Sequence, residues 1–132
     1  QSALVRVPTP KRGKVTSARI EYRSPDPSAN PYLTLSVILA AGLNGIEGNY
    51  ALPEEMASNV FDLSREERIA AGIARLPRSL SEAVEVMEES EVVAAALGEH
   101  VFEWFLRNKR AEWARYEQHV SRYELEEYLP IL

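Results

Sequence analysis

The chain has 132 residues, of which 45% are hydrophobic and 27% are charged, and these fractions are typical of a single soluble globular domain. It contains no cysteine, which excludes disulfide bonds, thiolate catalysis and cysteine metal sites and favours a reducing, cytoplasmic location. The longest apolar stretch, around residues 33–43, is shorter than the roughly 20 residues needed to span a bilayer, so we expect no membrane association. The basic N-terminus lacks the apolar run of a signal peptide.

The net charge of −5 hides an asymmetry along the chain. Residues 1–23 hold six basic side chains and one acid, a local charge of +5, whereas the remaining residues hold nine basic and nineteen acidic side chains, a charge of −10. A cationic segment on an acidic body predicts a local anion site. It argues against nucleic-acid binding, which usually needs a broad basic face.

The first segment predicts two strands. Residues 3–7 mix apolar and β-branched residues and stop at Pro8, and residues 18–23 alternate before a Pro-rich turn. The polar stretch 10–14 contains glycine and predicts the connection between them.

The rest of the chain predicts helices. Asn30 is a favourable N-cap before Pro31, and residues 32–43 are apolar on most faces, which predicts a buried helix weakened at its end by glycines. A loop should follow over residues 48–63, and residues 98–119 should form one long amphipathic helix. Capping boxes should open three short helices, at Ser64 with Glu67, Ser79 with Glu82, and Ser121 with Glu124. We therefore expect an α+β, mostly helical chain: a short antiparallel strand pair followed by five or six helices.

The alternation Arg19-x-Glu21-x-Arg23 is the most informative pattern. Alternate residues of a strand point to one face, about 6.6 Å apart. A carboxylate between two guanidiniums suits a site where the acid holds a divalent cation and the arginines hold phosphate or carboxylate oxygens. The alternative is a solvated sheet face with ion pairs worth only about 0–1 kcal/mol each.

The surroundings of this pattern resemble the type I glutamine synthetases. The resemblance is specific over RIEYRSPDPSANPYL at residues 19–33, AAGLNGI at residues 40–46 and SALVRVP at residues 2–8. It continues through NVFDL at residues 59–63 and SLSEA at residues 79–83. It implies that residues 1–132 are the C-terminal portion of a glutamine synthetase catalytic domain, with the N-terminal domain and most metal ligands absent.

The family makes glutamine from glutamate, ammonia and ATP through a γ-glutamyl phosphate intermediate. The resemblance implies that Glu21 is a ligand of a catalytic Mg²⁺ or Mn²⁺ ion. It implies that Arg23 binds glutamate near the reacting phosphoryl group, and that Arg6 and Arg19 lie on the ATP phosphate side. Lys14 is the candidate for a loop lysine that contacts the nucleotide. We expect His100 and His119, in the helical tail, to be ordinary helix residues rather than ligands.

Two positions depart from the family pattern. Gln1 stands where an arginine important for phosphoryl transfer is expected, either as a true substitution or as an artificial end of the chain. Phe61 stands where many relatives carry a tyrosine that receives an adenylyl group. Phenylalanine has no hydroxyl, so we expect no such modification at residue 61, and mass spectrometry that found one there would contradict the match.

The helical tail is rich in aromatic residues, for which a core position is preferred to an interface. The set comprises Phe102, Trp104, Phe105, Trp113, Tyr116, Tyr123 and Tyr128. The apolar end at residues 123–132 is hard for a small domain to bury, and such ends commonly mark association surfaces. In the family, subunits form stacked hexameric rings and this segment reaches into the facing ring, so the resemblance implies a homo-oligomer, a double-ring dodecamer, with the tail as anchor.

Three functions remain open at this point. The leading one is part of a glutamate–ammonia ligase that is inactive as the isolated chain. The second is a related γ-glutamyl ligase that acts on another amine, since the residues that select the amine mostly lie elsewhere. The third is a non-catalytic assembly or regulatory module, which the arginines and Glu21 disfavour.

Overall fold

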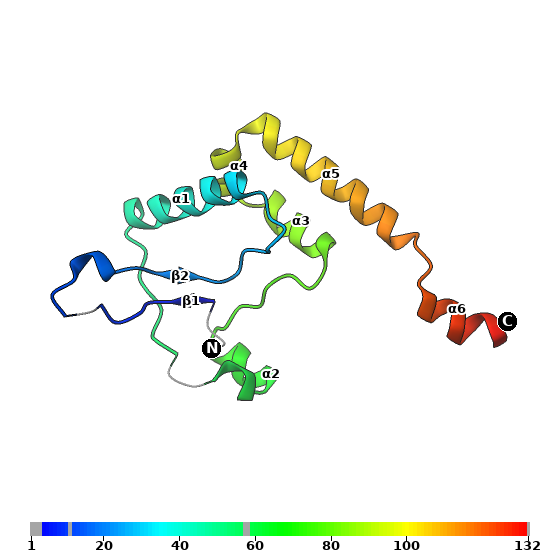
Figure 1. Cartoon of the computed structure of the whole chain (residues 1–132), viewed down its shortest axis with the longest axis horizontal. Coiled ribbons are helices and arrows are strands. Elements are labelled where there is room, and N and C mark those ends of the chain that lie inside the picture. Colours follow the sequence, from blue (N-terminus) through cyan, green and yellow to red (C-terminus); the bar gives the residue numbers. More distant parts are fainter. Residues whose placement is uncertain (1–3, 11, 57–58, 132) are drawn as a thin grey trace. The chain divides into compact units, whose positions relative to one another are not determined.

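The computed structural model describes residues 4–10, 12–56 and 59–131. These residues confirm the predicted α+β class, with an antiparallel pair of strands followed by six α-helices (Figure 1). The chain divides into two compact units, residues 1–75 and 76–132. In chain order the elements are the strand β1 (Val5–Arg6), the 3-10 helix η1 (Val15–Ser17), the strand β2 (Glu21–Tyr22), the helix α1 (Pro31–Glu47), the 3-10 helix η2 (Val60–Asp62), the helices α2 (Arg65–Ala70), α3 (Leu80–Glu88), α4 (Glu91–Leu97), α5 (Glu99–Glu117) and α6 (Arg122–Tyr128), and the 3-10 helix η3 (Leu129–Ile131).

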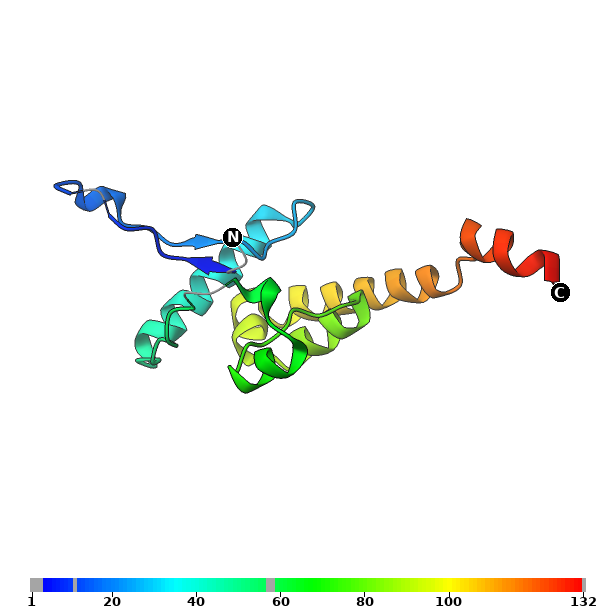
Figure 2. The ribbon, with the colours of Figure 1, turned by 90° about the horizontal axis from the view of Figure 1, so that it is seen from below.

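The first unit is built on the pairing of β1 with β2. The strands are antiparallel, with Val5 opposite Tyr22 and Arg6 opposite Glu21, and they lie side by side in both ribbon views (Figures 1 and 2). The N–H of Arg23 also donates to the carbonyl of Leu4 at 2.8 Å, which extends the ladder beyond the two strands. The observed strands are shorter than the predicted ranges 3–7 and 18–23, because the described backbone pairs only Val5–Arg6 with Glu21–Tyr22 as a ladder.

Helix α1 begins where the sequence predicts it. The side-chain oxygen of Asn30 accepts hydrogen bonds from the N–H groups of Tyr32 and Leu33, and Pro31 is the first helical residue. The prediction of a buried helix is wrong, because no residue of α1 is buried. Two strands of two residues are too small to cover a 17-residue helix that is apolar on most faces. We define the α1 stripe as its exposed apolar residues at helical spacing: Tyr32, Leu35, Leu39, Leu43 and Ile46.

The glycines do not end α1 where the sequence analysis placed its end. Gly42 and Gly45 lie inside the helix, which continues to a C-cap at Gly48. Tyr50 then folds back, with its N–H donating to the carbonyl of Gly45 at 3.0 Å and its hydroxyl donating to Oδ1 of Asn44 at 2.9 Å. A Cβ on Gly48 would lie 2.5 Å from the ring of Tyr50, so a residue with a side chain there would displace that ring.

The second unit is a small helical assembly in which α5 packs against both α3 and α4 (Figure 1). Val84 of α3 and Leu106 of α5 are its buried residues. Helix α5 confirms the single long helix predicted for residues 98–119. Gly98 joins α4 to α5 at φ 71° and ψ 154°, a conformation that favours glycine strongly.

The three predicted capping boxes all open helices. At Ser64 and Ser121 both reciprocal hydrogen bonds are present, with Glu67 and Glu124 as the partners. At Ser79 only half of the box forms: the serine accepts from the N–H of Glu82, but the carboxylate of Glu82 accepts from the N–H of Arg78 instead. Local sequence therefore sets these helix starts.

The core position preferred for the aromatic residues is wrong for four of the seven. Phe102, Phe105 and Trp113 are half-buried, because α3 and α4 cover only part of the long helix α5. The four exposed rings are Trp104, Tyr116, Tyr123 and Tyr128.

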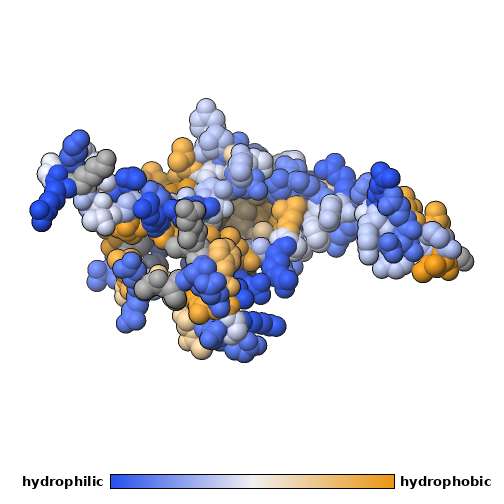
Figure 3. Space-filling view, turned by 60° about the horizontal axis from the view of Figure 1, so that its bottom comes forward, coloured by the Kyte–Doolittle hydropathy of each residue, from blue (hydrophilic) through white to orange (hydrophobic). Residues whose placement is uncertain are grey.

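The C-terminal end of the second unit is apolar and exposed. Leu125, Tyr128, Leu129 and Ile131 of α6 and η3 are all exposed, and Figure 3 shows hydrophobic atoms at the surface of this tip. Among the helices that the structure describes, none combines the length and the apolar character needed to cross a membrane.

Candidate functional site

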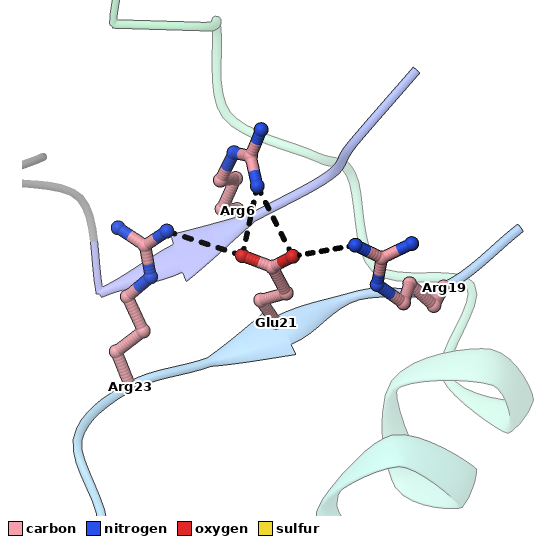
Figure 4. Close-up of polar contacts among 4 residues, drawn as sticks. All are labelled: Arg6, Arg19, Glu21 and Arg23. Atoms are coloured by element: carbon pink, nitrogen blue, oxygen red, sulfur yellow. Dashed lines mark hydrogen bonds and ion pairs between the residues drawn. The ribbon is translucent and has the colours of Figure 1, made fainter. Parts of the chain in front are cut away.

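The two strands bring together four charged side chains that are distant or alternate in the sequence. Arg6 on β1 lies opposite Glu21 on β2, fifteen residues later in the chain. Arg19 and Arg23 lie two residues on either side of Glu21, so the alternation of an extended chain points them to its face. The predicted shared face of Arg19, Glu21 and Arg23 is confirmed by their contacts (Figure 4).

All three guanidiniums converge on the Glu21 carboxylate (Figure 4). Oε1 of Glu21 accepts from Nη1 of Arg6 at 3.1 Å and from Nη2 of Arg19 at 2.9 Å. Oε2 accepts from the same Nη1 of Arg6 at 3.0 Å and from Nη2 of Arg23 at 3.1 Å. We call Arg6, Arg19, Glu21 and Arg23 the arginine–glutamate cluster.

The cluster carries an excess of positive charge. Three guanidiniums surround one carboxylate, so the cluster has a net charge of +2 when all four groups are ionised. Hydrogen bonds from Arg6, then Arg23 and Arg19, lower the pKa of Glu21 from 4.5 to about 2, against a smaller opposing effect of burial. The carboxylate is therefore ionised at neutral pH, and the face can attract an oxyanion.

Lys14 is not part of this cluster. It lies in the connection before η1, where its carbonyl accepts from the N–H and the hydroxyl of Ser17 at 2.9 and 2.7 Å. Of the predicted site residues, the structure thus brings Arg6, Arg19, Glu21 and Arg23 into contact, while no described contact joins the Lys14 side chain to them.

The donor set suits a divalent cation only in part. The Glu21 carboxylate is the hard oxygen ligand that Mg²⁺ and Mn²⁺ prefer, and it lies 27% exposed on the strand face. No cluster of three or more His, Asp or Glu side chains that could hold a metal occurs in residues 4–10, 12–56 and 59–131. His100 instead places its ring edge-on to Trp104, with 6.3 Å between centroids. Glu21 can therefore supply one ligand group, and further ligands must come from outside these residues.

The two positions that depart from the family pattern have different outcomes. Gln1 lies outside the described residues. Phe61 is in η2, which is capped by the Asn59 side chain, and its ring is 77% exposed. The expectation of no adenylylation at residue 61 rests on the missing hydroxyl of phenylalanine and stays a prediction.

Sequence reasoning missed the ion pair that joins α3 to α5 in the second unit, and the hollow beside it. Arg110 of α5 pairs with Glu88 of α3, twenty-two residues earlier. Both residues line a hollow of about 450 Å³, together with His100, Trp104 and Arg107 among others. The guanidinium of Arg107 lies 5.0 Å from the Trp104 ring centroid. Only the spacing of residues 100, 104 and 107 along one helix face could have indicated this group.

The comparisons with known proteins agree on one family. The family model described as "Glutamine synthetase, catalytic domain" matches residues 1–128. The glutamine synthetase of Mycolicibacterium smegmatis is 56% identical over 131 residues, which are 99% of this chain and 29% of that protein. The glutamine synthetase of Staphylococcus epidermidis is 46% identical over 129 residues, covering 98% of this chain and 28% of that protein.

A solved structure supports the same assignment at the level of the fold. The structure titled "Apo GmaS without ligand" matches with a TM-score of 0.69 and 35% sequence identity, over 85% of this chain and 25% of that one. The chain thus spans less than a third of the length of these curated relatives. Because the family model covers almost every residue, the chain belongs to the glutamine synthetase catalytic-domain family.

Proposed function

We propose that this chain supplies one edge of the active site of an ATP-dependent glutamate–ammonia ligase, which forms glutamine through γ-glutamyl phosphate. The observation that carries the proposal is the convergence of Arg6, Arg19 and Arg23 on Glu21. Phosphoryl transfer needs charge neutralisation over the transferring oxygens, and positioned guanidiniums with a metal-binding carboxylate provide it. A solvated surface network would not need a net charge of +2 on one short face.

The roles divide along the strand face. Glu21 is the ligand for a Mg²⁺ or Mn²⁺ ion, which when bound would neutralise charge on the phosphate oxygens. Arg23 binds the glutamate substrate beside the reacting phosphoryl group. Arg6 and Arg19 contact the ATP phosphates. Lys14, in the exposed connection between the strands, contacts the nucleotide.

The rest of the site lies outside these residues. One carboxylate provides at most two of the about six oxygen ligands that Mg²⁺ takes, and the relatives are more than three times as long as this chain. We propose that residues 1–132 are the C-terminal portion of one catalytic domain in a cytoplasmic enzyme. The isolated chain should therefore show no ligase turnover.

Assembly is part of the proposal. The exposed apolar tip of α6 and η3 suits an anchor in a second copy of the protein, in a homo-oligomer of stacked rings. Deletion of residues 129–132 from the full-length protein should weaken ring stacking, which analytical ultracentrifugation measures. An unchanged sedimentation profile would count against the anchor.

The test of function is a phosphate-release and product assay of the full-length protein that contains this chain. We expect glutamate- and ATP-dependent turnover with ammonia, and weaker turnover with a panel of primary amines. Preferred use of an amine would favour the related γ-glutamyl ligase instead, and the absence of turnover with any acceptor would favour the assembly module. The 132-residue chain alone is the negative control.

A further inference from the structure

The Glu21 carboxylate has no acceptor position left for a metal ion in this arrangement. An ionised carboxylate offers about four lone-pair sites. Four hydrogen bonds use them, two at Oε1 from Arg6 and Arg19 and two at Oε2 from Arg6 and Arg23. A cation can therefore coordinate Glu21 only after at least one guanidinium has withdrawn.

The guanidiniums, by contrast, keep unused donors. Each arginine of the cluster reaches Glu21 through a single nitrogen, although a guanidinium carries five N–H donors. Their side chains are 52%, 58% and 34% exposed for Arg6, Arg19 and Arg23 respectively. The next acid in the sequence, Asp26, accepts instead from the N–H and hydroxyl of Ser28. On this face the carboxylate oxygens that could bind a cation are all engaged, whereas N–H donors that could bind an oxyanion remain free.

We propose that an oxyanion and a divalent cation bind this face as a coupled pair, because the guanidiniums exchange Glu21 for the oxygens of the oxyanion. The inference rests on the proposed function and adds to it an order of events. Without an oxyanion, the arginines mask Glu21. A phosphoryl or carboxylate group that occupies their free donors draws them away and exposes the carboxylate to the cation.

The coupling follows from competition for the same lone pairs. The apparent affinity of a ligand is reduced by the fraction of protein in the competent state, which here is the fraction with Glu21 unmasked. Linkage requires that the cation tighten oxyanion binding by the same factor. The exchange needs only side-chain rotation, since the arginines are exposed and the strand register holds Arg6 and Glu21 opposite each other.

The experiment measures Mn²⁺ binding to the full-length protein by electron paramagnetic resonance of the free ion. Titrations in potassium chloride and in potassium sulfate at equal ionic strength use sulfate as the oxyanion, because it binds guanidinium but is a weak ligand of Mn²⁺. Glu21→Gln identifies the class of Mn²⁺ sites that Glu21 serves. We expect sulfate to tighten this class by about two- to fivefold, the range that an exposed ion pair allows.

Substitutions in the basic segment separate exchange from simple charge. Arg19→Gln removes the most exposed guanidinium of the cluster, so we expect tighter Mn²⁺ binding in chloride and a smaller effect of sulfate. Arg12→Gln is the matched control: it removes the same charge from the same segment, but Arg12 is not among the partners of Glu21. Arg12→Gln should change neither the Mn²⁺ affinity in chloride nor the effect of sulfate on that affinity.

The outcomes are distinguishable. A Glu21-dependent class that sulfate leaves unchanged, or that Arg19→Gln weakens, overturns the exchange while the metal role stands. Equal tightening by Arg12→Gln also overturns it, because net charge then explains the result. If Glu21→Gln removes no class of sites, the metal role of the proposed function fails and the exchange with it. If Arg19→Gln does not fold, the sulfate comparison in the unsubstituted protein decides alone.

Discussion

The two units differ in what holds their side chains in place. In the first unit, Arg6 and Glu21 meet across a strand pair, and the α1 stripe is exposed. In the second unit, α5 packs on α3 and α4 around Val84 and Leu106. The first unit therefore holds three arginines on one carboxylate with little apolar support, whereas the second holds a small apolar core and separate ion pairs of two residues each.

This difference between the two units predicts which substitutions change activity and which change the free energy of unfolding. Ion pairs between exposed groups contribute about 0–1 kcal/mol each, so the arginine–glutamate cluster cannot be explained by the stability that it provides. Burial of apolar side chains contributes more, about 1.5–3 kcal/mol for a residue such as Leu106. Substitutions in the cluster should thus affect activity first, and substitutions in the second unit should affect stability first.

The largest expected effect is the loss of activity on changing the cluster carboxylate. Glu21→Gln removes the negative charge that holds a cation, and we expect kcat of the full-length protein to fall by about 100-fold or more, as the loss of one transition-state contact does. Glu88→Gln is the matched control, since it removes a carboxylate paired with Arg110 in the second unit. It should change kcat by less than about twofold. Equal losses in the two variants would remove the distinction between the units.

The next largest effect is on the free energy of unfolding, when a glycine is replaced by alanine. The sign of this change is expected to differ between Gly98 in the second unit and Gly42 in the first. Gly98→Ala places a side chain at φ 71° with open space around it, so the penalty is that of the backbone alone, about 1–3 kcal/mol. Gly42→Ala adds a Cβ in open space inside α1 and should stabilise by about 0.5–1 kcal/mol. Urea unfolding followed by circular dichroism measures both. A neutral Gly98→Ala would show that the α4–α5 junction can relax.

Local rules predict much of this fold. Asn30, Ser64 and Ser121 each cap a helix because a cap depends on residues within three positions along the chain. The alternation of Arg19, Glu21 and Arg23 is equally local, so their common face could be predicted. The partnership of Glu82 with Arg78 rather than Ser79 shows the limit, since two nearby N–H donors compete for one carboxylate.

Long-range relations could not be predicted in the same way. Arg6 could be assigned to the site only by resemblance, because its place opposite Glu21 depends on the strand register. Burial of α1 was predicted from its composition alone, yet burial needs a covering surface, and none of the described residues of α1 is buried. Apolar composition shows that a surface needs a partner but not where that partner is.

The smallest expected effect is a change in the pKa of Glu21, measured in the metal-free protein. A pKa lowered from 4.5 to about 2 means that the stability contributed by the cluster is fully present above pH 4.5 and is lost as the pH falls through about 2. Carbon-13 NMR of the Glu21 carboxyl should show it still ionised near pH 3.

Arg6→Gln should raise the pKa of Glu21 more than Arg23→Gln or Arg19→Gln does, because Arg6 contributes two of the four hydrogen bonds. Added salt should raise it in all variants, since these groups are exposed and screened. Equal effects of the three substitutions would mean that overall charge, and not the cross-strand contact from Arg6, holds Glu21 ionised.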